Sequence, residues 1–225
     1  MEQSEIRECV KRSAQAVGVV LTDEHAYCFY KYLEHLTLWN KAINLTAIED
    51  SKEIIVKHFT DSLTALVSVS IQHGAVLIDI GTGAGFPSIP LKIVRPDLTC
   101  ELIEPNRKKV SFLTSIIGSL KLSNVSVFVG NIEDYIANPD HKLGDIVVFR
   151  ALKFEPIVKH VSSILHKSGL VILYRTERLK RASTGSLSVE AETSFSLPFG
   201  YGERVISVLR HQDSVPRGTS IMEKD

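Results

Sequence analysis

The first part of the chain has apolar residues at helical spacing. Ile6, Val10 and Val17 recur at intervals close to the 3.6-residue period of a helix, and Gly18 is a natural stop after them. Two further helices, each with one apolar face, are expected at about residues 22–41 and 52–67. The pattern therefore predicts an N-terminal helical cap over residues 1–70.

From residue 75 onward, short apolar runs alternate with helical stretches. The runs expected to be strands are Val76–Ile80, Thr99–Ile103, Val125–Val129, Ile146–Phe149 and Leu170–Tyr174. The stretches expected to be helices cover about residues 86–95, 106–120, 131–137 and 155–166. Strand, helix and strand in repetition predict βαβ units and a parallel sheet with helices on both faces.

The last part of the chain has a different pattern. Val189–Leu197 and Val205–Arg210 are strand-like runs joined by the loop Pro198–Glu203, a spacing that suits an antiparallel hairpin. The residues that follow are polar, and we expect a flexible tail at 211–225. The sequence thus predicts an α/β domain over residues 71–210, with a mostly parallel, Rossmann-like sheet that ends in the antiparallel hairpin.

Composition narrows the class of protein. The chain is 44% hydrophobic and 23% charged, as is usual for a soluble globular protein. No apolar stretch approaches the roughly eighteen residues that span a bilayer, and the polar N-terminus is unlike a secretory signal. The cysteines Cys9, Cys28 and Cys100 are widely spaced, which argues against a disulfide framework and a zinc site. We therefore expect a cytoplasmic monomer without a metal or a membrane contact.

A glycine-rich loop follows the first expected strand. It runs from Asp79 through Gly81, Gly83 and Gly85 to Phe86, a GxGxG pattern typical of class I methyltransferases. The third glycine of a dinucleotide fingerprint would fall at Phe86, which disfavours a nicotinamide oxidoreductase, and no Walker lysine follows. The glycines could also form a tight turn and nothing more. Their place between a strand and a helix favours a bound cofactor, S-adenosylmethionine.

The sequence around the fourth expected strand argues against some kinds of base methylation. Asp145–Arg150 has no Asp/Asn-Pro-Pro-aromatic element of the kind common in exocyclic-amine methylation. Cys100 lies early in the second strand, on the wrong side of the fold for the nucleophilic thiolate of pyrimidine C5 methylation. Guanine N7 needs positioning rather than deprotonation, because its lone pair is free at neutral pH. The absence of an obvious general base suits N7 methylation, although a protein that is not an enzyme would show the same absence.

Over about residues 25–210 the chain resembles the RsmG family, also called GidB, of bacterial enzymes that methylate N7 of a guanine in 16S rRNA. The motifs that carry this resemblance are Leu38-Trp39-Asn40-Lys41, Asn44-Leu45-Thr46, His58 with Asp61-Ser62-Leu63, the block Asp79–Pro96, Arg107–Leu113, Asn131-Ile132-Glu133, Arg150-Ala151 and Gly202-Glu203-Arg204. The combination is specific and covers most of the chain. It implies a class I methyltransferase fold, S-adenosylmethionine as the cofactor and 16S rRNA or the small ribosomal subunit as the partner.

The resemblance also implies roles for individual residues. The residues that would bind the cofactor are Gly81, Gly83, Phe86, Glu104, Ile132, Glu133 and Arg150. Among them, Glu104 ends the second strand and would accept hydrogen bonds from the ribose, while Ile132 and Glu133 would contact the adenosine end. Arg150 would lie near the methyl donor and the incoming base. We expect His58 and Asp61 to form a buried hydrogen-bonded pair, and no residue is assigned a catalytic role.

The chain departs from the usual family pattern at three places. Ser88 stands where the family usually has Gly, and Pro105-Asn106 after the second strand is unusual. Arg175-Thr176 replaces Lys-Gly at the end of the fifth strand, beside the expected RNA entry. The last change leaves open a protein that binds rRNA on a decayed methyltransferase fold without catalysis. A methyltransferase that acts on a small molecule or a protein is the other alternative.

An RNA partner must be bound through a local patch. The chain has 26 basic and 26 acidic residues, so its formal net charge is zero, whereas bulk-charge RNA binders are basic. The candidates for phosphate contacts are the basic residues that follow the fifth strand, Arg175, Arg178, Lys180 and Arg181. A second cluster, Arg107-Lys108-Lys109, is the weaker candidate because a basic run is more often a solvated face.

Overall fold

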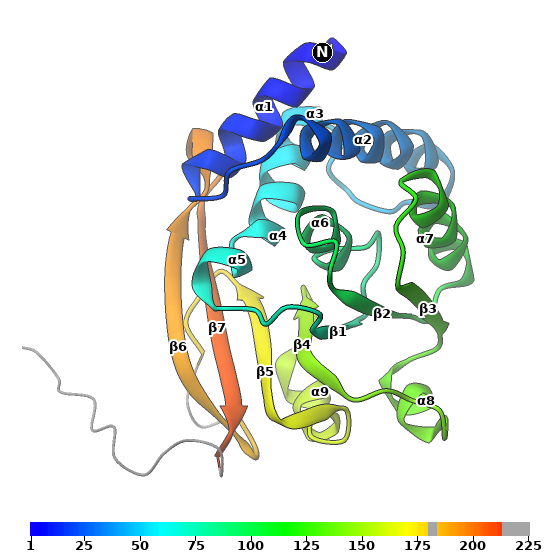
Figure 1. Cartoon of the computed structure of the whole chain (residues 1–225), viewed down its shortest axis with the longest axis vertical. Coiled ribbons are helices and arrows are strands. Elements are labelled where there is room, and N and C mark those ends of the chain that lie inside the picture. The colour runs from blue at the N-terminus through cyan, green and yellow to red at the C-terminus, as the bar shows by residue number, and fades with distance from the viewer. Residues whose placement is uncertain (180–183, 213–225) are drawn as a thin grey trace, which may run out of the picture.

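The computed structural model describes residues 1–179 and 184–212. Its seven strands form one sheet in the order β3-β2-β1-β4-β5-β7-β6 (Figure 1). Their bounds are β1 Val76–Ile80, β2 Thr99–Glu104, β3 Val125–Val129, β4 Gly144–Arg150, β5 Leu165–Arg175, β6 Leu187–Ser196 and β7 Glu203–His211. Strands β1 to β5 are parallel, and β7 lies antiparallel between β5 and β6. The predicted fold class, a Rossmann-like methyltransferase sheet with a C-terminal hairpin, is confirmed.

Helices cover both faces of this sheet (Figure 1). The N-terminal helices are α1 Gln3–Ala16, α2 Asp23–Ile43, α3 Ser51–Ile54, a π-helical segment Ile55–Thr60, α4 Asp61–Leu63 and α5 Ala65–Ser68. The others are α6 Ser88–Val94, α7 Arg107–Ser119, α8 Ile132–Ala137, α9 Phe154–Val161 and a short 3-10 turn Pro198–Gly200. Helix α2 packs on α6 and α7, so the N-terminal helices extend one helical layer, while α8 and α9 lie on the other face.

The alternation of side chains along the strands divides the core into two layers. Leu77 of β1 and Val148 of β4 are buried with the N-terminal helices and α6. Their neighbours Ile78 and Val147 point to the opposite face and are buried against α8 and α9. Both faces of the central strands are therefore apolar, as parallel strands between two helical layers require.

Two sequence expectations are wrong in detail. The helix expected at about 155–166 ends at Val161, and β5 begins at Leu165, before the expected start. Ile164 and Leu165 continue the helical spacing of apolar residues, but they are buried from a turn and a strand start instead. The helix expected at about 52–67 is interrupted by the π-helical segment. The division into a cap (1–70), a cofactor domain (71–210) and a tail (211–225) stays a prediction.

Candidate functional site

The glycine loop connects β1 to α6 at the carboxyl edge of the sheet. Gly81 N–H donates to the carbonyl oxygen of Ile103 (2.8 Å), and Gly83 N–H donates to Oε2 of Glu104 (2.9 Å), so the loop is fixed to the end of β2. Both glycines have positive φ, +66° and +63°, a conformation that favours glycine. A Cβ on Gly83 would meet nothing closer than 4.0 Å, so a ligand can approach the backbone there.

Glu104, at the end of β2, has a fixed carboxylate. It is only 4% exposed, and its Oε1 accepts the N–H of Asn106 (2.9 Å) while Oε2 accepts that of Gly83. Each carboxylate oxygen has two lone pairs, so both retain one for a further donor such as a ribose hydroxyl. Asn106, one of the unusual residues after β2, also caps α7 through its side chain. The unusual residue therefore supports the carboxylate that the sequence assigned to the ribose.

Asp79 ends β1 below the loop and is fully buried. Its Oδ2 accepts from the hydroxyl of Thr82 (2.8 Å) and from both the hydroxyl and the N–H of Ser88, while Oδ1 has no partner among the described residues. Burial raises the pKa of Asp79 to about 7, although the bonds from Ser88 and Thr82 oppose the shift. Ser88, which stands where the family usually has Gly, thus supplies a hydroxyl donor to this carboxylate.

Phe86 is packed inside the loop rather than displayed by it. The side chain is 6% exposed and lies between Tyr32, at a ring distance of 5.4 Å, and His58, at 4.7 Å. The guanidinium of Arg150 lies 5.1 Å from the centre of the same ring. Tyr32 also donates its hydroxyl to the carbonyl oxygen of Ala84. The ring therefore connects the glycine loop to the N-terminal helices, and its expected contact with the cofactor stays a prediction.

Ile132 and Glu133 begin α8, which follows β3. Ile132 is buried in the core, whereas the side chain of Glu133 is 55% exposed and lies 3.0 Å from Nε2 of His160. An exposed carboxylate beside a buried apolar side chain can accept a hydrogen bond from a ligand that rests on the apolar surface. The role of this pair at the adenosine end stays a prediction.

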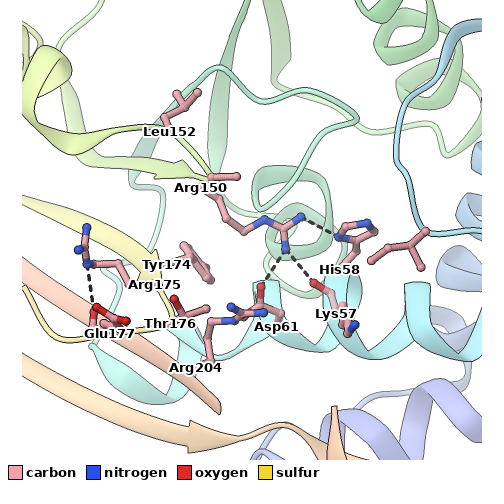
Figure 2. Close-up of a pocket in the computed structure, with 12 residues that line it drawn as sticks. Lys57, His58, Asp61, Arg150, Leu152, Tyr174, Arg175, Thr176, Glu177 and Arg204 are labelled. Carbon is pink, nitrogen blue, oxygen red and sulfur yellow. Dashed lines mark hydrogen bonds and ion pairs between the residues drawn. The ribbon is translucent and has the colours of Figure 1, made fainter. Parts of the chain in front are cut away.

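A cavity of about 470 Å³ opens at the carboxyl edge of the sheet (Figure 2). Its walls come from the π-helical segment and α4, and from the ends of β4, β5 and β7. The residues that line it are Ile48, Lys57, His58, Asp61, Arg150, Ala151, Leu152, Tyr174, Arg175, Thr176, Glu177 and Arg204. Leu152 also borders the glycine loop, because a Cβ on Gly81 would lie 2.7 Å from its Cδ1. The cavity and the loop are therefore neighbours.

Arg150, at the end of β4, is anchored to the N-terminal helices by three hydrogen bonds. Its Nη1 donates to the carbonyl oxygen of Lys57 (3.1 Å) and to Oδ2 of Asp61 (2.9 Å). Its Nη2 donates to Nδ1 of His58 at 3.0 Å (Figure 2). Lys57 and His58 lie in the π-helical segment, a distortion that often occurs at functional sites. The segment presents a carbonyl and an imidazole to one guanidinium.

Because arginine has only donors, Nδ1 of His58 accepts and its proton lies on Nε2, which bonds Oγ1 of Thr46 (2.8 Å). Burial, and then the charge of Arg150, lower the pKa of His58 to about 3, so the imidazole is neutral near pH 7. Asn40 holds the backbone of Thr46 through two bonds of 2.9 Å. The polar residues of four separate sequence motifs thus form one network.

Asp61 is the buried centre of the network. It is 1% exposed, and its Oδ1 accepts from Nε of Arg204 (2.7 Å) while Oδ2 accepts from Arg150. The expected hydrogen bond between His58 and Asp61 is not found: each bonds to Arg150 instead. Arg204, the second residue of β7, was not a predicted site residue. Its membership of the motif Gly202-Glu203-Arg204 was the signal that could have identified it.

The four predicted RNA contacts fall in different places. Arg175 lines the cavity, with its Nε bonded to the carbonyl oxygen of Glu177 (3.1 Å). The side chain of Arg178 is 69% exposed, does not line the cavity and lies 3.9 Å from Glu192. Lys180 and Arg181 lie outside the described residues. Arg175 therefore keeps a cation in the cavity where the family usually has lysine.

Within residues 1–179 and 184–212, no group of three or more His, Cys, Asp or Glu side chains is placed to hold a metal ion. In the same ranges, no helix is both long enough and apolar enough to cross a membrane.

Solved structures of low sequence identity share the fold. One is MtNAS in complex with MTA and tNA, with a TM-score of 0.58 at 12% identity over 94% of this chain and 90% of that one. Another is coclaurine N-methyltransferase bound to N-methylheliamine and SAH, with a TM-score of 0.52 at 14% identity over 86% of this chain and 74% of that one. These similarities support the methyltransferase architecture.

Sequence comparison identifies the family. A protein from Lachnoclostridium phytofermentans named ribosomal RNA small subunit methyltransferase G is 35% identical over 90% of this chain and 88% of its own length. One of the same name from Pelotomaculum thermopropionicum is 42% identical, but the match spans 62% of this chain and 58% of that protein. The family described as GidB, rRNA small subunit methyltransferase G, matches residues 26–195. The chain therefore belongs to the GidB family and is a methyltransferase with S-adenosylmethionine as its cofactor.

Proposed function

We propose that the chain transfers a methyl group from S-adenosylmethionine to N7 of a guanine in 16S rRNA. The observation that carries the choice of N7 is the state of the buried ionisable groups in the cavity. His58 already accepts from Arg150 through Nδ1, and both oxygens of Asp61 accept from arginines. The lone pair of His58 is already used, and a proton on Asp61 would remove the negative charge that both arginines face, so neither group is a ready proton acceptor. An acceptor nitrogen with a free lone pair, which loses no proton when it is methylated, suits this cavity.

The residues of the glycine loop fit the cofactor. Gly83 leaves open space beside its backbone, and the adjacent carboxylate of Glu104 is held in place with lone pairs to spare. Gly81, Gly83 and Glu104 would hold the cofactor, with Glu133 as a further acceptor at its adenosine end. When bound, S-adenosylmethionine supplies a methyl group that is electrophilic because it is attached to a positively charged sulfur.

The protein's own contribution in this proposal is to orient the acceptor base. Three bonds fix the guanidinium of Arg150 at the carboxyl end of β4, beside the cavity and next to the glycine loop. Its Nε has no hydrogen-bond partner among the described residues and is not buried. Because Arg150 lines the cavity, this N–H is open to it. A fixed N–H there can donate to O6 of the guanine and hold N7 toward the loop.

The test is to incubate the protein with methyl-labelled S-adenosylmethionine and unmodified small ribosomal subunits, and then to identify the labelled nucleoside after digestion. We expect 7-methylguanosine, and we expect its loss in the variants Arg150→Ala and Gly83→Asp. Arg210→Ala, which changes an arginine near the far end of β7 that does not line the cavity, is the matched control. Label in another nucleoside would refute N7 as the target. Cofactor binding without any labelled RNA would refute the rRNA substrate.

The proposal also covers the form of the rRNA substrate, the oligomeric state of the chain and its location in the cell. The substrate is 16S rRNA, either free or within the small subunit, and the chain acts on it as a monomer in the cytoplasm. Sedimentation of the purified protein alone checks the monomer, and cell fractionation checks the location.

A further inference from the structure

Arg204 presents a guanidinium that the protein uses only in part. Its Nε donates to Oδ1 of Asp61 (2.7 Å), which fixes the plane of the group at the start of β7. Its two terminal nitrogens have no hydrogen-bond partner among the described residues, and they are not buried. The side chain is 18% exposed and lines the cavity (Figure 2). The fork of Nη1 and Nη2 is therefore directed at the open space.

We propose that the terminal nitrogens of Arg204 bind a phosphate group of the substrate RNA, on the backbone of the nucleotide that enters the cavity or the one next to it. This inference rests on the proposed function, because it takes RNA as the substrate. It adds a binding contact on β7.

The charge around Arg204 favours an anion. Asp61 is the single carboxylate bonded to both Arg150 and Arg204, so the trio has one positive charge in surplus. His58 adds no charge near neutral pH, because burial lowers its pKa to about 3. Lys57 does not change this balance, since its ammonium is paired with Glu53. The surplus charge remains next to the fork of Arg204.

The geometry of the fork suits a phosphate group. A guanidinium that is anchored through Nε keeps its two terminal N–H groups parallel, and this arrangement matches two oxygens of one phosphate. Holding the side chain in advance also lowers the entropy that binding must cost. Arg175 on β5 is anchored through Nε in a similar way, but to the carbonyl oxygen of Glu177 rather than to a buried carboxylate.

The same strand offers a matched control. Arg210 of β7 is likewise bonded through Nε to a carboxylate, that of Glu190 (2.5 Å), and its Nη1 donates to the carbonyl oxygen of Ser168 (2.9 Å). It lies at the other end of the strand and does not line the cavity. Replacing either arginine removes the same charge from the same strand. The effects on RNA binding differ only if the position matters.

The experiment measures the affinity of the full chain for unmodified small ribosomal subunits over a series of salt concentrations. For Arg204→Gln we expect binding to weaken about fivefold to tenfold at low salt, and the slope of log K against log salt to fall by roughly one. Arg204→Lys should keep most of the slope but lose affinity, because a point charge replaces the fork. Arg210→Gln should behave as the unchanged chain. Calorimetry with S-adenosylmethionine should give the same cofactor affinity for all four proteins.

Three outcomes would overturn the inference. An unchanged salt slope for Arg204→Gln would mean that no phosphate contact is lost, even if binding weakens. Equal losses for Arg210→Gln would show a general charge effect, and a fall in cofactor affinity that Arg204→Lys does not restore would show a structural role.

The methylation assay separates this inference from the proposed function. If 7-methylguanosine forms normally and Arg204→Gln keeps its salt slope, the inference fails and the function stands. If RNA binding depends on Arg204 while no guanine is methylated, the function fails and the contact stands.

Discussion

The shared carboxylate of Asp61 leads to the sharpest prediction about stability. Asp61→Ala removes the one acidic side chain that, among the described residues, is bonded to Arg150 and to Arg204, and leaves two guanidiniums without it at the edge of the core. Arg204→Ala, in contrast, leaves Asp61 bonded to Arg150. We therefore expect the first substitution to be the more damaging, although both change one residue of the same trio.

The magnitudes follow from burial. Asp61 is 1% exposed, and the arginine side chains are 14% and 18% exposed, so the charges are poorly solvated. Removing one partner of a buried ion pair costs about 3–5 kcal/mol of unfolding free energy. Because Arg150 keeps its bonds to Lys57 and His58, we expect the lower end, about 3 kcal/mol, for Asp61→Ala. Arg204→Ala loses one charged hydrogen bond and should cost about 1.5–2 kcal/mol.

Urea unfolding at pH 7, followed by far-ultraviolet circular dichroism, measures both values. For a chain of this size, about 3 kcal/mol corresponds to a fall in Tm of roughly 6–12 °C. The slope of the free energy against urea should stay the same, since the surface exposed on unfolding does not change. A loss below about 1 kcal/mol for Asp61→Ala, or a larger loss for Arg204→Ala, would refute the argument that one carboxylate neutralises both arginines.

Four variants give further predictions about other parts of the site. Burial raises the pKa of Asp79 to about 7 from 3.8, so the folded state holds this proton more tightly and stability falls as pH rises between these values. Asp79→Asn should remove that fall when urea midpoints at pH 5 and pH 8 are compared. Ser88→Gly, which removes a hydroxyl donor to the carboxylate, should raise the pKa of Asp79 further and extend the fall to higher pH. Gly83→Ala places a methyl group in open space at a φ of +63°, so calorimetry should show weaker cofactor binding, with a stability loss of only about 1 kcal/mol. Tyr174→Phe removes the hydroxyl that donates to the carbonyl oxygen of Ser62 (2.7 Å) and should cost about 1–2 kcal/mol in urea unfolding, with no change in cofactor affinity.

Local pattern was enough to predict the sheet. The expected bounds of Val76–Ile80 and Val125–Val129 agree with β1 and β3, because each run is short, apolar and bounded by polar residues or glycine. The helix expected at about 155–166 was too long for a related reason. Ile164 kept the helical spacing, and nothing in the local sequence marks a turn there that is buried by tertiary contacts.

The network around Arg150 could not be predicted from spacing alone. Asp61 and Arg204 are 143 residues apart, and they meet because β7 returns antiparallel beside β5 and begins next to α4. The π-helical segment was equally hidden, since the apolar residues of 52–67 fit one regular helix. The motifs in the sequence, such as the one that includes His58, contain the residues of the network. They do not show which of these residues are bonded to one another. The prediction from sequence paired His58 with Asp61, and it named Arg150 as a site residue without placing it between them.

A chain without net charge can still bind RNA when its cations are in surplus at one place. The 26 basic residues equal the 26 acidic ones, which by itself counts against an RNA partner. At the cavity, however, one buried carboxylate faces two guanidiniums, and the neighbouring imidazole is neutral near pH 7. The field of one surplus charge is screened within about 8 Å at physiological salt. Such a site attracts RNA weakly from a distance and acts only on contact. Because bulk charge supplies most non-specific affinity, its absence should leave recognition to the cavity itself.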